Sequence, residues 1–446
     1  MPPPQIPLVS TSPPGIPDAG VPPQRRLVHW RRRIIGGLFC LVVLIGWLNG
    51  IPASLFKLQA QRQLQRGLPY QAQPWLMWAK RLNGTDAELE FLIARTCRIQ
   101  GDMNSTRSHL ERAWKLGYPV AKLEREQTLA QAQSGQMQAA EPALSALLVD
   151  PRGDVTDICE AFVTGYIRTY RLPQAERLLG VWLADLPRQP RALILRAKMQ
   201  MERFNWKPAE QDLRTVLVVV PEHAEAANLL AEVLLKQKQP GAGLQVLPVA
   251  VKNPRTRLTA QLHEVECYRI QAQEQSARRL LQSILRENPD CIQAHLDLGS
   301  LESDAGAFEL AVRELERARE LAPNFPDVRY ALAVALRGSG RDTEAKEHFD
   351  FVTKARQAVA EAMNLRVKVE QKPTDAELRC RIGTTLLDYG QTERGLVWLQ
   401  GALDVNPSLV AAHERLAQYY ESRANQSDEL AKLAIEHRKL ASTSGR

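Results

Sequence analysis

The stretch IQAHLDLGSLESDAGAFELAVRELERARELAPNF, residues 292–325, contains the pattern that decides the fold of this chain. Gly306 marks a turn between two amphipathic segments, because glycine adopts the positive φ that such a turn needs. Ala311 and Leu315 lie one helical turn apart on the packing face of the second segment, and Pro323 ends it. The stretch therefore predicts two helices joined by a tight turn.

The same pattern recurs along the chain with a period of 34 residues. A large apolar residue takes the place of Leu315 at spacings of 34, 34, 35, 34, 34, 34, 34, 34, 50 and 34 residues. A small residue usually precedes it by four positions, which lets two helices approach closely. A fixed period of this length predicts a helical repeat array, with about eleven hairpins here. The large residues, called the marker residues below, are Leu76, Leu110, Leu144, Leu179, Leu213, Leu247, Leu281, Leu315, Phe349, Leu399 and Leu433.

This pattern resembles the tetratricopeptide repeat (TPR) family, whose unit reads W-x2-L-G-x2-Y, then A-x3-F, then A and P. The resemblance covers residues 53–443 and is most specific at 292–325, 326–357 and 376–409. It implies an all-α fold, a TPR-like αα-hairpin solenoid wound as a right-handed superhelix. We expect about nine repeats over 53–357 and two, including a polar cap, over 376–443. The segments 121–155 and 410–443 depart furthest from the repeat pattern.

The spacing of 50 residues indicates an insertion of sixteen residues, which we place within the segment 358–375. We expect it to prolong the preceding helix to about Val369. Thr374 and Glu377 fit a capping box that opens the next helix. The segment either fills a kink in the superhelix, which the pattern favours, or protrudes as an interaction helix.

The N-terminal region differs in composition from the repeats. Residues 1–33 contain nine prolines before a basic flank of five arginines, which predicts a disordered cytoplasmic tail that acts as a spacer or binds a proline-recognition domain. Residues 34–56 carry no charge and predict a single-pass transmembrane signal anchor. A cleaved signal peptide and a buried globular helix are the alternatives. The arginines place the N-terminus in the cytoplasm and the array outside it, in the periplasm if the protein is bacterial.

Composition and motifs argue against several functions. The formal charge is +8, but only +4 lies beyond residue 33, which is too weak to predict nucleic-acid binding. His263 and Cys267 share a helix face and could form half a metal site, yet no second pair follows, so helix packing is favoured. The six cysteines suit unpaired packing thiols better than a Cys267–Cys291 disulfide. We predict no cofactor, no metal, no small-molecule substrate and no enzyme activity.

The groove predicted for a TPR array supplies the candidate binding residues. In this family, positions 2, 5, 9 and 12 of each first helix face the concave groove. A run of lysine and asparagine that would hold a terminal carboxylate is absent, so that function is not carried over. The candidate groove residues are Arg191, Lys198, Asn228, Glu232, Tyr330, Arg337 and Thr384.

Together these features predict a scaffold or adaptor that binds protein or peptide partners and is held to a membrane through residues 34–56. The layout resembles membrane-anchored bacterial TPR accessory proteins that assist secretion or envelope assembly. A secreted soluble module after signal cleavage is the alternative. A substrate-presenting part of an enzyme complex is a weaker one, because no stretch outside the repeats is long enough for a catalytic domain.

Overall fold

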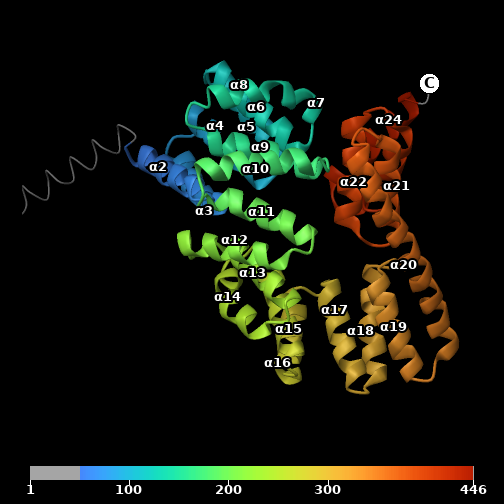
Figure 1. Ribbon diagram of the computed structural model, residues 1–446. Coiled ribbons are helices and arrows are strands. Elements are labelled where there is room, and N and C mark those ends of the chain that lie inside the picture. The colour runs from blue at the N-terminus through green and yellow to red at the C-terminus, as the bar shows by residue number, and fades with distance from the viewer. Residues whose placement is uncertain (1–50, 445–446) are drawn as a thin grey trace, which may run out of the picture.

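The computed structural model describes residues 51–444, and every regular element in that range is a helix (Figure 1). The helices form eleven successive hairpins, and the predicted all-α repeat fold is confirmed. The first six are α2 (Ile51–Gln65) with α3 (Pro69–Leu82), α4 (Ala87–Gln100) with α5 (Met103–Lys115), α6 (Val120–Ser134) with α7 (Met137–Ala140), η1 (Glu141–Ala143) and α8 (Leu144–Val149), α9 (Val155–Arg168) with α10 (Leu172–Asp185), α11 (Pro190–Glu202) with α12 (Trp206–Val219), and α13 (Ala224–Lys236) with α14 (Pro240–Lys252). The other five are α15 (Arg257–Ile270) with α16 (Glu274–Glu287), α17 (Ile292–Asp304) with α18 (Phe308–Leu321), α19 (Pro326–Gly338) with α20 (Asp342–Gln371), α21 (Ala376–Asp388) with α22 (Thr392–Val405), and α23 (Val410–Glu421) with α24 (Asp428–Ser444) after the short helix η2 (Ala424–Gln426).

The marker residues lie on the second helix of each hairpin and form much of its core. Seven of them are at most 2% exposed. Close approach explains the glycine of the L-G pair in the repeat unit: a Cβ added to Gly299 on α17 would lie 2.5 Å from Cγ of Leu315 on α18. The two helices of this hairpin therefore depend on the missing side chain at Gly299.

The residue that joins the two helices adopts a positive φ in ten hairpins, with values between 56° and 97°. It always stands nine residues before the marker residue. Glycine occupies six of these ten places, and the other four are held by larger residues. The ten residues are Gly67, Gly101, Gly135, Tyr170, Phe204, Lys238, Ala272, Gly306, Gly340 and Gly390.

The third hairpin has a broken second helix. Its residues 137–149 divide into α7, η1 and α8. Pro142 lacks the amide N–H that would bond to the carbonyl of Gln138, so the α-helical ladder tightens into a 3₁₀ turn there. The marker residue Leu144 follows this break and is only half-buried. This is one of the two segments in which the sequence pattern is weakest.

The insertion lengthens one helix. Helix α20 runs unbroken from Asp342 to Gln371, so the inserted residues continue it as predicted. The capping prediction was wrong by one residue. Asp375, not Thr374, caps α21, because its carboxylate accepts a hydrogen bond of 2.9 Å from the amide of Leu378.

The N-terminal predictions lie mostly outside the described residues. The tail 1–33 and residues 34–50 of the predicted anchor are not described. Residues 51–56 begin α2, where Ala53 is buried and Phe56 stacks on Trp75 of α3 with ring centroids 5.8 Å apart. This end of the predicted anchor therefore belongs to the array. Among the described helices, none is both long and apolar enough to cross a bilayer.

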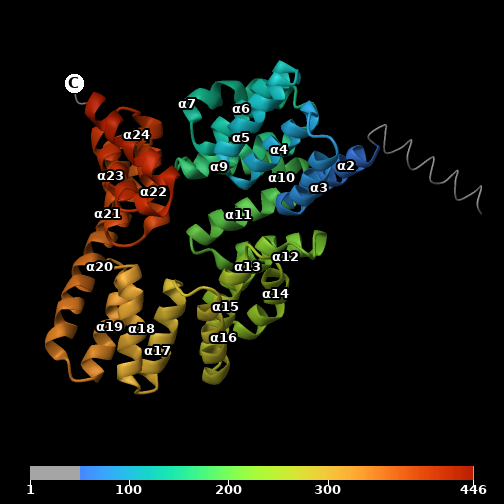
Figure 2. The ribbon, with the colours of Figure 1, turned by 180° about the vertical axis from the view of Figure 1, so that it is seen from behind.

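The array also makes contacts between hairpins far apart in sequence. Arg394 of α22 forms a 3.3 Å ion pair with Glu202 of α11, and Trp398 lies 4.4 Å from the ring of Tyr170 at the α9–α10 turn. Figures 1 and 2 show α22 beside the ends of α9 and α10 in both views. The hairpins from α11 to α22 therefore close into a ring.

Candidate functional site

The first helices of the second to fifth hairpins meet in a buried cluster of charged side chains. We call it the arginine network, and it consists of Arg95 and Arg98 on α4, Glu126 and Gln133 on α6, Asp157 and Glu160 on α9, and Arg191 on α11. Arg98 is fully buried. Its Nε pairs with Glu126 and its Nη1 donates a 2.8 Å hydrogen bond to Oε1 of Gln133. Within the network, three guanidinium groups face three carboxylates, and Arg95 also pairs with Asp154 at its edge.

Asp157 stands at the centre of the arginine network. Its Oδ1 accepts a 2.6 Å hydrogen bond from Nη1 of Arg191, and its Oδ2 pairs with Arg95 and lies 3.4 Å from Nη2 of Arg98. Burial alone would raise the pKa of this carboxyl, but Arg191, Arg95 and Arg98 hold it well below its usual range. Asp157 is therefore ionised at every pH at which the protein is expected to work.

Arg191 was predicted to face the groove, where a partner could bind it, but it is not accessible in the structure. Arg191 is buried and its guanidinium contacts Asp157 and Glu160. The turn between α2 and α3 packs over it: a Cβ added to Gly67 would lie 3.1 Å from Cγ of Arg191. Because this turn comes from a distant part of the chain, the positional rule for groove residues could not anticipate the cover.

Three other candidates lie on the neighbouring first helices α11 and α13. Lys198 is exposed and its Nζ lies 2.7 Å from Oε1 of Glu225, which is exposed as well. Asn228 and Glu232 are half-buried on α13, and the buried Oδ1 of Asn228 has no hydrogen-bond partner. Burial raises the pKa of Glu232, and the nearby carboxylate of Glu266 adds to the effect. This polar surface on α11 and α13 is the largest group of predicted residues that the structure brings together.

The remaining candidates lie apart, in later hairpins. Tyr330 and Arg337 on α19 contact α20, where the edge of the Tyr330 ring meets Phe349 at 5.9 Å and the Arg337 guanidinium lies 5.3 Å from the same Phe349 ring. Thr384 is half-buried on α21 and hydrogen-bonded to the thiol of Cys380. These residues form no joint site with Lys198 and Asn228.

Sequence reasoning missed a further polar group between α15 and α17. Asp297 accepts hydrogen bonds of 3.1 Å from Nη1 of Arg269 and 3.1 Å from Nε2 of Gln293. Burial raises the pKa of Asp297 to about 6. The positional rule, applied to these two hairpins, would have selected Arg269 and Gln293. It would have missed Asp297, which stands at position 6 of its unit.

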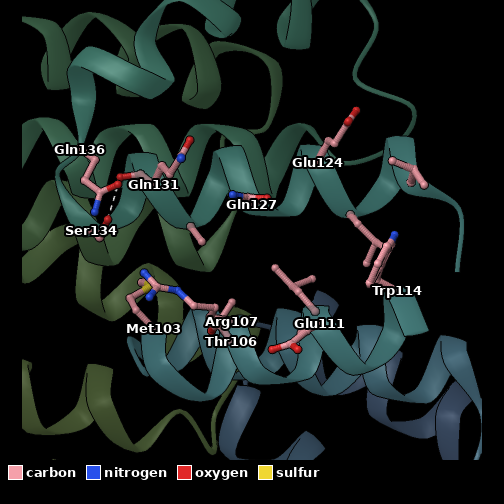
Figure 3. Close-up of a pocket in the computed structure, with 14 residues that line it drawn as sticks. Met103, Thr106, Arg107, Glu111, Trp114, Glu124, Gln127, Gln131, Ser134 and Gln136 are labelled. Carbon is pink, nitrogen blue, oxygen red and sulfur yellow. Dashed lines mark hydrogen bonds between the residues drawn. The ribbon is translucent and has the colours of Figure 1, made fainter. Parts of the chain in front are cut away.

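Cavities open at two places on the surface of residues 51–444. The first, about 480 Å³, lies between α5 and α6, whose side chains face each other across it, with Trp114 at one end (Figure 3). The second, about 560 Å³, is lined by Phe325, Arg415 and Tyr419 among others. Neither lining includes histidine, the residue that most often serves as a general acid or base.

His263 and Cys267 do not form a metal site with their surroundings. Cys267 is fully buried in the core of the sixth and seventh hairpins. Burial, with a smaller contribution from the charge of Lys236, lowers the pKa of His263 to about 4. Across residues 51–444, no three His, Cys, Asp or Glu side chains are grouped so that they could hold a metal ion.

Comparison with known proteins identifies the repeats. Two overlapping segments, residues 275–324 and 296–352, match the tetratricopeptide repeat family. They include the hairpin α17–α18, where all marks of the sequence pattern coincide. Residues 275–352 therefore carry tetratricopeptide repeats.

Similar solved structures are distant. The chain is similar to PilW, a type IV pilus biogenesis factor, with 20% identity over 44% of this chain and 90% of that one and a TM-score of 0.41. The chain is also similar to MamA, with 18% identity over 39% of this chain and 94% of MamA and a TM-score of 0.32. Its identity to human IFIT1, solved with m7Gppp-AAAA, is 16% over 80% of this chain and 90% of IFIT1, with a TM-score of 0.40. These likenesses are too weak to indicate a partner. No curated protein matches the sequence.

Proposed function

We propose that this protein is a membrane-anchored scaffold that binds a protein partner on the polar surface of α11 and α13, outside the cytoplasm. One observation supports this location of the binding site. Equivalent positions on α4 and α9 are consumed by the arginine network, whereas Lys198 and Glu225 are exposed and Asn228 keeps an unpaired carbonyl oxygen. Exposed charged side chains and an unpaired amide oxygen suit an extended peptide or a helix with polar side chains.

The anchor is supported by the sequence. Residues 34–50 are uncharged, and five arginines precede them, as expected for a segment whose N-terminal side stays in the cytoplasm. The array would then face the extracytoplasmic side. A scaffold held there would collect partners at the membrane, in the manner expected of factors that assist secretion or assembly.

A site-specific crosslink tests the binding surface. A photo-crosslinking amino acid placed at Lys198 in the full chain should give discrete adducts in intact cells. The same amino acid at Val218, which is exposed on the second helix of the same hairpin, should not. Adducts of equal yield at both positions, or at neither, would show that this surface is not the binding site.

A separate measurement tests the anchor. The full chain should stay in the membrane fraction after alkaline extraction and should become sensitive to protease only when the extracytoplasmic side is opened. Release into the soluble fraction would favour a cleaved, secreted module. Protection from the outside with exposure to the cytoplasm would reverse the proposed orientation.

A further inference from the structure

The first hairpin exposes several large apolar side chains that no neighbouring hairpin buries. Five of its large apolar side chains are between 40% and 57% exposed. On α2 the exposed face is opposite the one that buries Ala53 and Ala60. On α3 it is opposite Leu76. The exposed residues, called the apolar end below, are Leu55, Leu58, Met77, Trp78 and Leu82.

The apolar end occupies one end of the hairpin, because the other end is held by the array. At the turn, Arg66 pairs with Glu222, and the Arg255 guanidinium lies 3.7 Å from the Tyr70 ring. The start of α2 and the end of α3 lie at the opposite, open end. Figures 1 and 2 show α2 at the outer edge of the array in both views. The five side chains at this end are all at least 40% exposed.

The charge of the hairpin is as unusual as its apolar surface. Residues 51–82 hold five Lys and Arg and no Asp or Glu. Of the 58 basic and 50 acidic residues in the chain, residues 1–50 hold five and one, so residues 83–446 keep 48 basic and 49 acidic. The first hairpin therefore has a net charge of +5, whereas residues 83–446 have a net charge of −1.

Two of the hairpin's basic side chains are free to meet an anion. Lys57, Arg66 and Lys80 pair with carboxylates of neighbouring helices. Arg62 and Arg81 are exposed, and neither forms an ion pair with a carboxylate of the described residues. Arg62 shares the face of Leu55 and Leu58, and the Arg81 guanidinium lies 4.8 Å from the ring of Trp78. On each of the two helices, a basic side chain thus lies on the same face as exposed apolar ones.

The hairpin directly follows the proposed membrane anchor, and this closeness indicates that a membrane covers the apolar end. The apolar run ends at Leu48, and only Asn49 and Gly50 separate it from the first residue of α2. Two residues span at most about 7 Å. If residues 34–50 are in a bilayer, as proposed above, the start of α2 cannot stand clear of its surface.

We infer that the apolar end lies in the interface of an anionic membrane, with its apolar side chains at the boundary of headgroups and acyl chains and with Arg62 and Arg81 against lipid phosphates. Leucine, tryptophan and arginine on one helical surface are the composition of interfacial segments. Anionic headgroups attract exposed basic side chains next to a membrane span. The hairpin would fix the array in one orientation on the membrane. This inference rests on the proposed anchor.

Fluorescence in vesicles tests the inference with the full chain. An environment-sensitive fluorophore is attached to Leu55→Cys and, as the control, to Val181→Cys on α10; the two side chains are 57% and 59% exposed. The chain without an introduced cysteine supplies the background from native thiols. In phosphatidylglycerol vesicles, position 55 should emit at shorter wavelength and be quenched by spin-labelled lipid several-fold more than position 181. Arg62→Glu with Arg81→Glu should remove at least half of this difference.

The outcomes separate the inference from the anchor. Equal quenching at both positions, in chains that resist alkaline extraction, would overturn the inference and leave the anchor standing. Chains that are extracted would overturn both. A blue shift at position 55 that increases with the protein-to-lipid ratio and persists in neutral lipid would assign the surface to a second copy of the chain and overturn the lipid contact.

Discussion

Replacement of Asp157 by asparagine tests the arginine network, because the substitution keeps the shape of the side chain and removes one charge. The wild-type side chain is 2% exposed and pairs with three arginines. In the variant, the buried guanidinium groups of Arg98 and Arg191 share two carboxylates, Glu126 and Glu160, while the partly exposed Arg95 keeps its ion pair with Asp154. Breaking a buried ion pair by removing one partner costs about 3–5 kcal/mol. We expect a loss in that range, located in the second to fifth hairpins.

Hydrogen exchange followed by mass spectrometry measures this loss region by region, which suits a repeat array that need not unfold in one step. Amides of α4, α6, α9 and α11 should exchange faster in the variant, and those of α21 to α24 should not change. Glu421→Gln is the control. Glu421 pairs with Arg438 at the surface, where both are about half exposed, so its loss should be under about 1 kcal/mol.

The pH dependence of stability at acid pH gives a second test of the same variant. The folded-state pKa of Asp157 is depressed, so its contribution is present above the unfolded value of 3.8 and is lost as the pH falls below it. The stabilities of wild type and variant should therefore converge as the pH falls below about 4. If Asp157→Asn costs no more than Glu421→Gln at pH 7, the network does not stabilise these hairpins and the reasoning is refuted.

Three further predictions concern the turns, a buried carboxyl and the ring. Ala272→Gly should raise the free energy of unfolding of its hairpin by about 0.5–1 kcal/mol, measured by chemical denaturation. The backbone strain of alanine at φ 56° is larger than the conformational entropy that glycine adds to the unfolded chain. Gly306→Ala should lower the free energy of unfolding by a similar amount. Burial raises the pKa of Asp404 from 3.8 to about 6, so the folded chain holds a proton that the unfolded chain releases, and the wild type loses stability as the pH rises from 4 to 6. This loss is worth up to roughly 3 kcal/mol. Asp404→Asn should lack it when unfolding curves are measured over a series of pH values. Trp398→Ala should open the ring contact with Tyr170, seen as a larger radius of gyration in small-angle scattering, whereas an unchanged radius would mean that other contacts suffice to hold the ring.

The sequence predicted the hairpins well because their information is local. A small residue, a large one and a proline fall within a single repeat, so the 34-residue period alone locates both helices. Four of the predicted turns carry no glycine. At Tyr170 and Phe204 the positive φ that usually calls for glycine is adopted by an aromatic residue, so the repeat period locates those turns and the residue type does not. The ring of Tyr170 is instead held by its contact with Trp398, more than two hundred residues away.

The candidate site was less predictable for the same physical reason. A positional rule says which side chains of a first helix face the groove, but it cannot say what else lies in the groove. Arg191 and Lys198 obey the same rule on the same helix, yet the turn at Gly67 covers one and leaves the other exposed. The cover depends on how tightly the superhelix winds, and that depends on the summed geometry of several hairpins. Local spacing does not contain this information.

The two ends of the array therefore have different roles. The arginine network and the cover at Gly67 make the first five hairpins a closed unit whose groove positions are used internally. The contact of Arg394 with Glu202 closes the later hairpins onto that unit. A partner that reaches Lys198 must then approach beside the Arg394 contact, and ring closure would limit how large a segment can enter. Trp398→Ala should consequently raise crosslinking yield at Lys198 if the ring restricts entry, and leave it unchanged if the partner binds from outside the ring.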